Sequence, residues 1–124
     1  MHKQEYQLLA NLVLPTGILD YFSISKIDQT PEVYSIYLEE NNQIPIEYSH
    51  DKLVSKGFYE EVNIQDFPIR GNKVYLHIRR RRWINQTTGD IVSRDWDLVA
   101  KGTRMTEEFA SFLKELAGYT TSKR

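Results

Sequence analysis

The chain has 124 residues, of which 40% are hydrophobic, 12% aromatic and 27% charged. This composition is typical of one globular domain and excludes wholesale disorder. The apolar runs are far too short to cross a bilayer, and the first residues lack the features of a signal peptide, so we expect a cytoplasmic protein with no membrane partner. The chain has no cysteine, which excludes disulfides, thiolate zinc sites and cysteine catalysis. We expect a single domain over residues 1–124, with an ordered core over about 4–118.

The two halves of the chain differ in charge. Residues 1–68 carry four basic and eleven acidic side chains, a sum of −7, whereas residues 69–124 carry twelve basic and six acidic ones, a sum of +6. Within 70–104, nine basic residues face three acidic ones. This asymmetry favours a surface for nucleic acid or for an acidic partner. The alternative is that the two halves neutralise each other inside the fold, with these acidic partners for the basic run: Glu39, Glu40, Glu60 and Glu61.

The first half of the chain predicts a helix, a hairpin and a third strand. An apolar repeat of helical period is ended by Pro15, and the strands are rich in β-branched and aromatic residues. Alternation in the second strand places Tyr34, Ile36 and Leu38 on its buried face. The predicted elements are a helix over 4–14, strands over 21–28 and about 33–40, a surface loop over 41–51 and an extended segment over 57–67.

Residues 73–84 form the longest predicted strand. Its alternation directs Val74, Leu76 and Ile78 to the core and makes the opposite face a basic and aromatic stripe. Because unpaired guanidinium groups are costly to bury, the strand must leave the core by Arg80. We therefore predict a projecting β-ribbon that turns at 87–90 and returns over 91–99. The stripe consists of Lys73, Tyr75, His77, Arg79, Arg81 and Trp83.

The last element is a predicted helix that ends near Gly118. Thr106 is a suitable N-cap, and apolar residues follow at helical spacing from Phe109 to Leu116. The predicted fold class is therefore α+β: an antiparallel sheet with a long basic β-ribbon, flanked by an N-terminal and a C-terminal helix.

The run from His77 to Trp83, with its four consecutive arginines, is the strongest functional signal. Arginine forks match phosphate oxygens and guanine edges, and a two-stranded ribbon can enter a major groove, so duplex DNA fits better than a small anion. Trp83 and Trp96 have a stronger alternative interpretation, as core residues or as rings stacked on arginines. The candidate DNA-binding residues are Lys73, His77, Arg79, Arg80, Arg81, Arg82, Trp83, Arg94, Lys101 and Arg104.

Metal binding and catalysis have little support. His2, His50 and His77 are far apart in the sequence, and no phosphate loop or nucleophile elbow occurs. Asp95 and Asp97 would share one face of the returning strand, where they could hold magnesium in a nuclease or balance Arg94, and we favour the balance. We expect a non-catalytic chain without a cofactor or metal.

Three segments together resemble a known family: 64–71 (IQDFPIRG), 74–83 (VYLHIRRRRW) and 103–106 (TRMT) before a helix. In this order and spacing they are similar to the N-terminal region of bacterial insertion-sequence transposases. The resemblance covers about residues 18–117. It implies a mobile-element protein for DNA transposition and recombination that binds duplex DNA at the terminal inverted repeats, with a separate or downstream catalytic domain as a partner.

The chain departs from the family pattern in two ways. The zinc ribbon of the family needs paired cysteines near 41–48 and after Trp83, and this chain has none, so the zinc role is not carried over. The chain also stops soon after the first helix of the expected helix-turn-helix, which implies either a short upstream reading frame or a fragment of a longer transposase. A rival interpretation is a protein-interaction module whose basic ribbon docks an acidic partner, a catalytic subunit or another copy of the chain.

Overall fold

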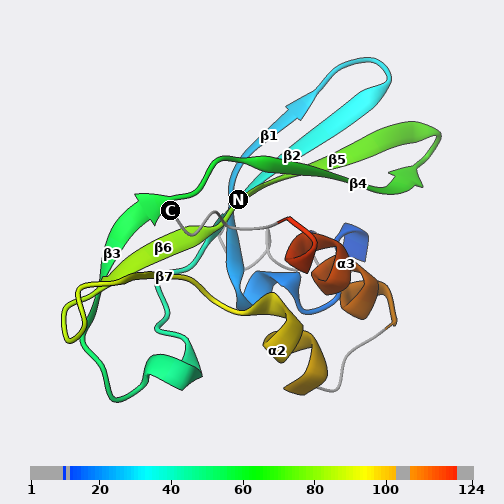
Figure 1. Ribbon diagram of the computed structural model, residues 1–124. Coiled ribbons are helices and arrows are strands. Elements are labelled where there is room, and N and C mark those ends of the chain that lie inside the picture. The colour runs from blue at the N-terminus through cyan, green and yellow to red at the C-terminus, as the bar shows by residue number, and fades with distance from the viewer. Residues whose placement is uncertain (1–9, 11, 103–106, 120–124) are drawn as a thin grey trace.

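Two β-sheets and a layer of helices make up the computed structural model, which describes residues 10, 12–102 and 107–119 (Figure 1). The arrangement is α+β, as predicted. In chain order the elements are the 3-10 turn η1 (Ile18–Asp20), β1 (Phe22–Gln29), β2 (Val33–Glu40), the 3-10 turn η2 (Ile46–Tyr48), β3 (Leu53–Phe58), β4 (Val62–Ile69), β5 (Asn72–Arg79), β6 (Arg81–Asn85), β7 (Ile91–Val92), α2 (Trp96–Gly102) and α3 (Glu107–Ala117).

The first sheet has the strand order β1-β2-β5-β4. β1 and β2 form the predicted antiparallel hairpin, with Ile24 opposite Leu38. β5 runs parallel to β2, with Ile36 opposite Leu76, so the expectation of a wholly antiparallel sheet is wrong. The reason is the chain path: β4 forms the far edge of the sheet and turns back antiparallel into β5, which places β5 beside β2 in the same direction.

The main core lies between this sheet and the helices. The predicted inward faces are confirmed, because Leu38, Val74, Leu76 and Ile78 are all buried. Burying each such side chain contributes roughly 1.5–3 kcal/mol, which makes this layer the main source of stability. On the helical side the core is completed by Leu14, Ile18, Trp96, Phe109, Phe112, Leu113 and Leu116.

The predicted projecting ribbon is wrong. β5 ends at Arg79, the strand is interrupted at Arg80, and β6 begins at Arg81 in a second sheet of order β3-β6-β7. Arg80 is 4% exposed and Trp83 is fully buried, so the arginine run does not leave the protein. The interruption at Arg80 shifts the in-and-out alternation of side chains by one residue. Trp83 therefore points into the core, whereas an uninterrupted strand would have placed it on the same face as Arg79.

Two further boundaries differ from the prediction. The extended segment expected over 57–67 is two strands, β3 and β4, in different sheets. The returning strand expected over 91–99 is only Ile91–Val92, after which the chain forms α2. The cause is Asp95, whose carboxylate accepts a hydrogen bond from the Leu98 N–H and so caps a helix.

The terminal helices agree with the prediction where they are described. α3 spans Glu107–Ala117, and the Gly118 N–H donates the closing hydrogen bonds to the Lys114 and Glu115 carbonyls. Ala10, Leu12 and Val13 are helical, but most of the predicted helix over 4–14, and the predicted cap Thr106, lie outside the described residues. None of the described helices is long and apolar enough to span a bilayer.

Gly17 provides a test of how the turn after the N-terminal helix packs. Its φ is +101°, and a Cβ placed there would lie 2.9 Å from ring carbons of Phe109. Gly17→Ala should therefore lower the free energy of unfolding by about 2–4 kcal/mol through strain and overpacking. Gly71→Ala, which also has a positive φ but no atom near its Cβ position, should cost only about 1 kcal/mol. Urea denaturation measures both, and equal losses would contradict the packing.

Candidate nucleic-acid interface

Acidic residues of the first half contact part of the predicted basic stripe. Arg79 Nη1 lies 3.0 Å from a Glu39 carboxylate oxygen, and His77 Nδ1 lies 3.1 Å from a Glu61 carboxylate oxygen. His77 also stacks on Tyr37, with ring centroids 4.2 Å apart. Internal neutralisation, one of the two interpretations of the charge asymmetry, is thus confirmed for Arg79.

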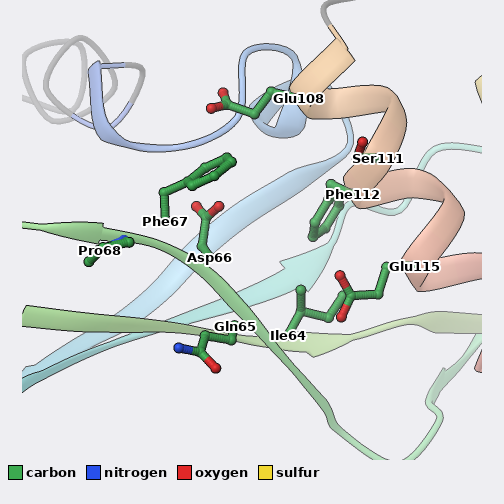
Figure 2. Close-up of a pocket in the computed structure, with 9 residues that line it drawn as sticks. All are labelled: Ile64, Gln65, Asp66, Phe67, Pro68, Glu108, Ser111, Phe112 and Glu115. Carbon is green, nitrogen blue, oxygen red and sulfur yellow. The ribbon is translucent and has the colours of Figure 1, made fainter.

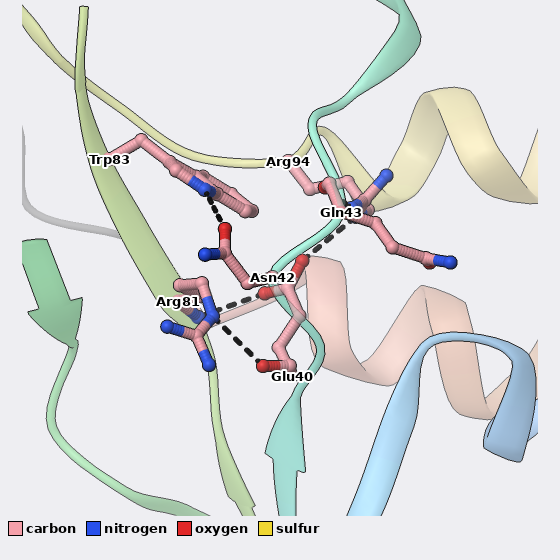
Figure 3. Close-up of polar contacts among 6 residues, drawn as sticks. All are labelled: Glu40, Asn42, Gln43, Arg81, Trp83 and Arg94. Atoms are coloured by element: carbon pink, nitrogen blue, oxygen red, sulfur yellow. Dashed lines mark hydrogen bonds and ion pairs between the residues drawn. The ribbon is translucent and has the colours of Figure 1, made fainter. Parts of the chain in front are cut away.

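Glu40 is the centre of the largest polar network (Figure 3). This carboxylate, at the end of β2, is 1% exposed and accepts hydrogen bonds from Arg94 Nε at 2.8 Å and from the Arg81 backbone N–H at 2.9 Å. Burial raises the pKa of Glu40, while the bonds from Arg94 and Arg81 oppose that shift. The Arg81 side chain donates to the Glu40 backbone carbonyl and to the Ser55 hydroxyl. Neither arginine has its guanidinium free for a ligand.

The two tryptophans pack around this network. Trp83 is fully buried and donates its indole N–H to the Asn42 side chain at 2.8 Å. The Arg94 guanidinium carbon lies 5.4–5.9 Å from the ring centroids of Tyr21, Trp83 and Trp96. The interpretation of both tryptophans as core residues or arginine-stacking rings is confirmed.

Arg80 has no carboxylate partner among the described residues. Its Nη1 donates to the Tyr119 carbonyl at 2.8 Å, its guanidinium faces the Tyr59 ring, and its buried Nε has no hydrogen-bond partner. Burial lowers the pKa of this guanidinium. The prediction that the strand must leave the core at Arg80 is therefore wrong. The Tyr119 carbonyl and the Tyr59 ring take the place of water around the buried guanidinium.

The remaining candidates are scattered. Lys73 is the second residue of β5 and Lys101 lies near the end of α2, both exposed, while Arg104 is outside the described residues. Asp95 caps α2 and Asp97 lies in its first turn, so the two do not share a strand face. Within the described part of the chain, no three His, Asp or Glu side chains form a group that could hold a metal ion.

One face of the second sheet carries three basic side chains that, unlike Arg79 and Arg94, form no ion pair with a described carboxylate. Register pairs Val54 with Ile84 and Ile84 with Ile91, so these three side chains form a row across the sheet. Lys52 and Lys56 alternate on the same side as Val54, and Arg82 on the same side as Ile84. Ion pairs to any other described residue are absent for these three cations. We name this set the cationic face: Lys52, Val54, Lys56, Arg82, Ile84 and Ile91.

Of the cationic face, only Arg82 was among the predicted site residues. Lys52 and Lys56 were missed because the third strand was predicted to begin at 57 and the preceding loop to end at 51, which left both outside any predicted element. The pattern Lys52-x-Val54-x-Lys56 in the sequence carries the period-2 signal that could have identified them.

On the other side of the molecule, a groove of about 610 Å³ lies between β4 and α3 (Figure 2). Ile64 and Phe112 are buried in its floor, and Phe67 is 69% exposed. Burial raises the pKa of Asp66, although the Phe67 backbone N–H donates to its carboxylate. Among the described residues, no lysine or arginine lines this groove. We name this set the acidic groove: Ile64, Asp66, Phe67, Glu108, Phe112 and Glu115.

Comparison of the chain with protein-family models, with curated proteins and with solved structures found no significant match.

Removal of the Glu40 carboxylate should be much more costly than removal of its neighbour. Glu40→Ala leaves the buried Arg94 side chain without its carboxylate partner and should lower the free energy of unfolding by about 3 kcal/mol. Glu39→Ala breaks only the partly exposed pair with Arg79 and should cost less than about 1 kcal/mol. Urea denaturation at neutral pH measures both effects, and a Glu40 effect no larger than that of Glu39 would refute the network.

The burial of Trp83 can be tested by fluorescence quenching. Single-tryptophan variants Trp83→Phe and Trp96→Phe should both show weak quenching by iodide when folded, since both indoles are shielded in this structure. Unfolding in urea should restore strong quenching in each. Strong quenching of the folded Trp96→Phe variant, which retains only Trp83, would instead support a projecting ribbon.

Proposed function

We propose that this chain is a non-catalytic DNA-binding region that contacts duplex DNA through the cationic face. The observation that carries the proposal is the contrast between two groups of cations. Arg94 is paired with the buried Glu40 carboxylate, and the partly exposed Arg79 is paired with Glu39. Lys52, Lys56 and Arg82 instead surround an exposed apolar row without an ion pair among the described residues. Cations without internal partners are the ones that can release counterions from phosphates.

The geometry of the face supports binding to a polyanion more than to a small molecule. A three-stranded sheet presents its cations along neighbouring strands, and the Arg82 Nε is fixed by the Lys56 carbonyl at 3.2 Å. The Tyr59 ring centroid lies 5.8 Å from the Arg82 guanidinium carbon, which further restricts this side chain. Fixed cations on an open surface suit phosphate contacts, which position a protein on DNA without reading its sequence.

The finer part of the proposal follows from the resemblance of the sequence to the N-terminal region of insertion-sequence transposases. We propose that the DNA is the terminal inverted repeat of such an element and that a catalytic transposase domain, separate or downstream, acts with this chain. Of the ten residues expected to contact DNA, Arg82 belongs to the cationic face, whereas Arg79, Lys73 and Lys101 lie outside it.

Fluorescence anisotropy with a labelled duplex tests the cationic face. The triple variant Lys52→Gln, Lys56→Gln, Arg82→Gln should bind more weakly, and the log–log salt slope should flatten by about 0.9 for each phosphate that the variant no longer neutralises. The control triple variant Lys26→Gln, Arg70→Gln, Lys114→Gln removes the same charge from exposed positions elsewhere and should change affinity and slope much less. Equal effects of the two variants would refute the assignment of the face.

The rival function, docking of an acidic protein partner, uses the same cations. The apolar row, in which Val54 and Ile91 are exposed and Ile84 is half-buried, favours it, because a protein interface has an apolar centre. The salt dependence separates the two, since apolar contacts persist at salt concentrations that release duplex DNA. Absence of duplex binding by the folded chain at low salt would favour the acidic partner.

A further inference from the structure

The cationic face and the acidic groove are complementary in charge and in apolar content. The face carries three cations around exposed aliphatic side chains, with Val54 42% and Ile91 46% exposed. The groove carries three carboxylates around the exposed ring of Phe67 and holds no cation among its lining residues. Both surfaces therefore leave apolar area and one sign of charge without a partner among the described residues.

The two surfaces cannot meet within one molecule. Figure 1 places the β3-β6-β7 sheet at one end of the structure and the junction of β4 with α3 at the other. Figure 2 shows Phe67 and Asp66 projecting from β4 towards α3, with Glu108 and Phe112 on the helix side. The apolar and acidic groups of the groove therefore gather on a surface that the β3-β6-β7 sheet of the same molecule does not reach.

We propose that the acidic groove of one copy of this chain receives the cationic face of a second copy. The contact joins two different surfaces, so it is head-to-tail. The assembly then has one unused groove at one end and one unused face at the other. Such contacts extend into short chains or rings rather than closing as a symmetric dimer. The groove is small and its charges are exposed, so the contact is weak and sensitive to salt.

This inference does not rest on the proposed DNA binding, because it concerns the protein alone. If both hold, the cationic face cannot contact a duplex and a neighbour at once, so DNA and self-association compete. Each can fail without the other: sedimentation in the absence of DNA tests the self-association, and anisotropy with dilute protein tests the DNA binding.

Sedimentation velocity at low salt tests the proposal with paired charge-reversal variants. The weight-average mass of the wild type should rise above 14.6 kDa with concentration, and added salt should reverse the rise. A groove variant (Glu108→Lys, Glu115→Lys) and a face variant (Lys52→Glu, Lys56→Glu) should each stay monomeric. Their equimolar mixture should associate again, because the native face of the groove variant matches the native groove of the face variant, and the two reversed surfaces also match each other in charge.

Control variants with the same net charges separate this contact from general attraction. Glu32→Lys, Glu47→Lys and Lys26→Glu, Arg70→Glu alter exposed positions outside both surfaces, so each should self-associate alone and their mixture should exceed a dimer. Circular dichroism verifies that all four proteins are folded. A monomeric wild type at about millimolar concentration, a mixture of the groove and face variants that stays monomeric, or a groove variant that still self-associates would each overturn the proposal.

Discussion

The buried carboxylate of Glu40 is the constraint that holds the two sheets in register. It ends β2 in the first sheet and accepts hydrogen bonds from the first residue of β6 in the second sheet and from Arg94, which precedes α2. A charge in this position is costly to bury unless every lone pair has a donor, so the network specifies one arrangement of sheets and helix. The three aromatic rings around Arg94 exclude water from it, and this shielding strengthens each polar contact inside.

The sequence predicts the parts of this fold that depend on local pattern. Alternation located the inward face of Ile36 and Leu38, and helical spacing located α3. Arg80 shows where that reasoning stops, because a single break in pleating exchanges the two faces, and only tertiary partners such as the Tyr119 carbonyl and Tyr59 make a buried guanidinium tolerable. Asp95 is a second case, since a capping carboxylate overrode a strand-like stretch of sequence.

The charge asymmetry is explained only in part by the fold. Glu39 and Glu40 neutralise Arg79 and Arg94, so a count of charges along the chain overstates the free positive surface. Two of the remaining charged clusters, the cationic face and the acidic groove, lie on elements at opposite ends of the molecule (Figure 1). Composition predicted that a charged surface exists, but which cations belong to it depends on pairings between residues far apart in the chain, which no local pattern records.

The parallel pairing of β2 with β5 has a consequence for the order of folding. The β1-β2 hairpin and the β4-β5 hairpin close over short stretches of chain, whereas Ile36 and Leu76 meet only after the intervening loop has been closed. Contacts of such long sequence separation form slowly and appear late. The two hairpins therefore form before the central ladder joins them, and the last step leaves the inner edges of β2 and β5 unpaired until it is complete.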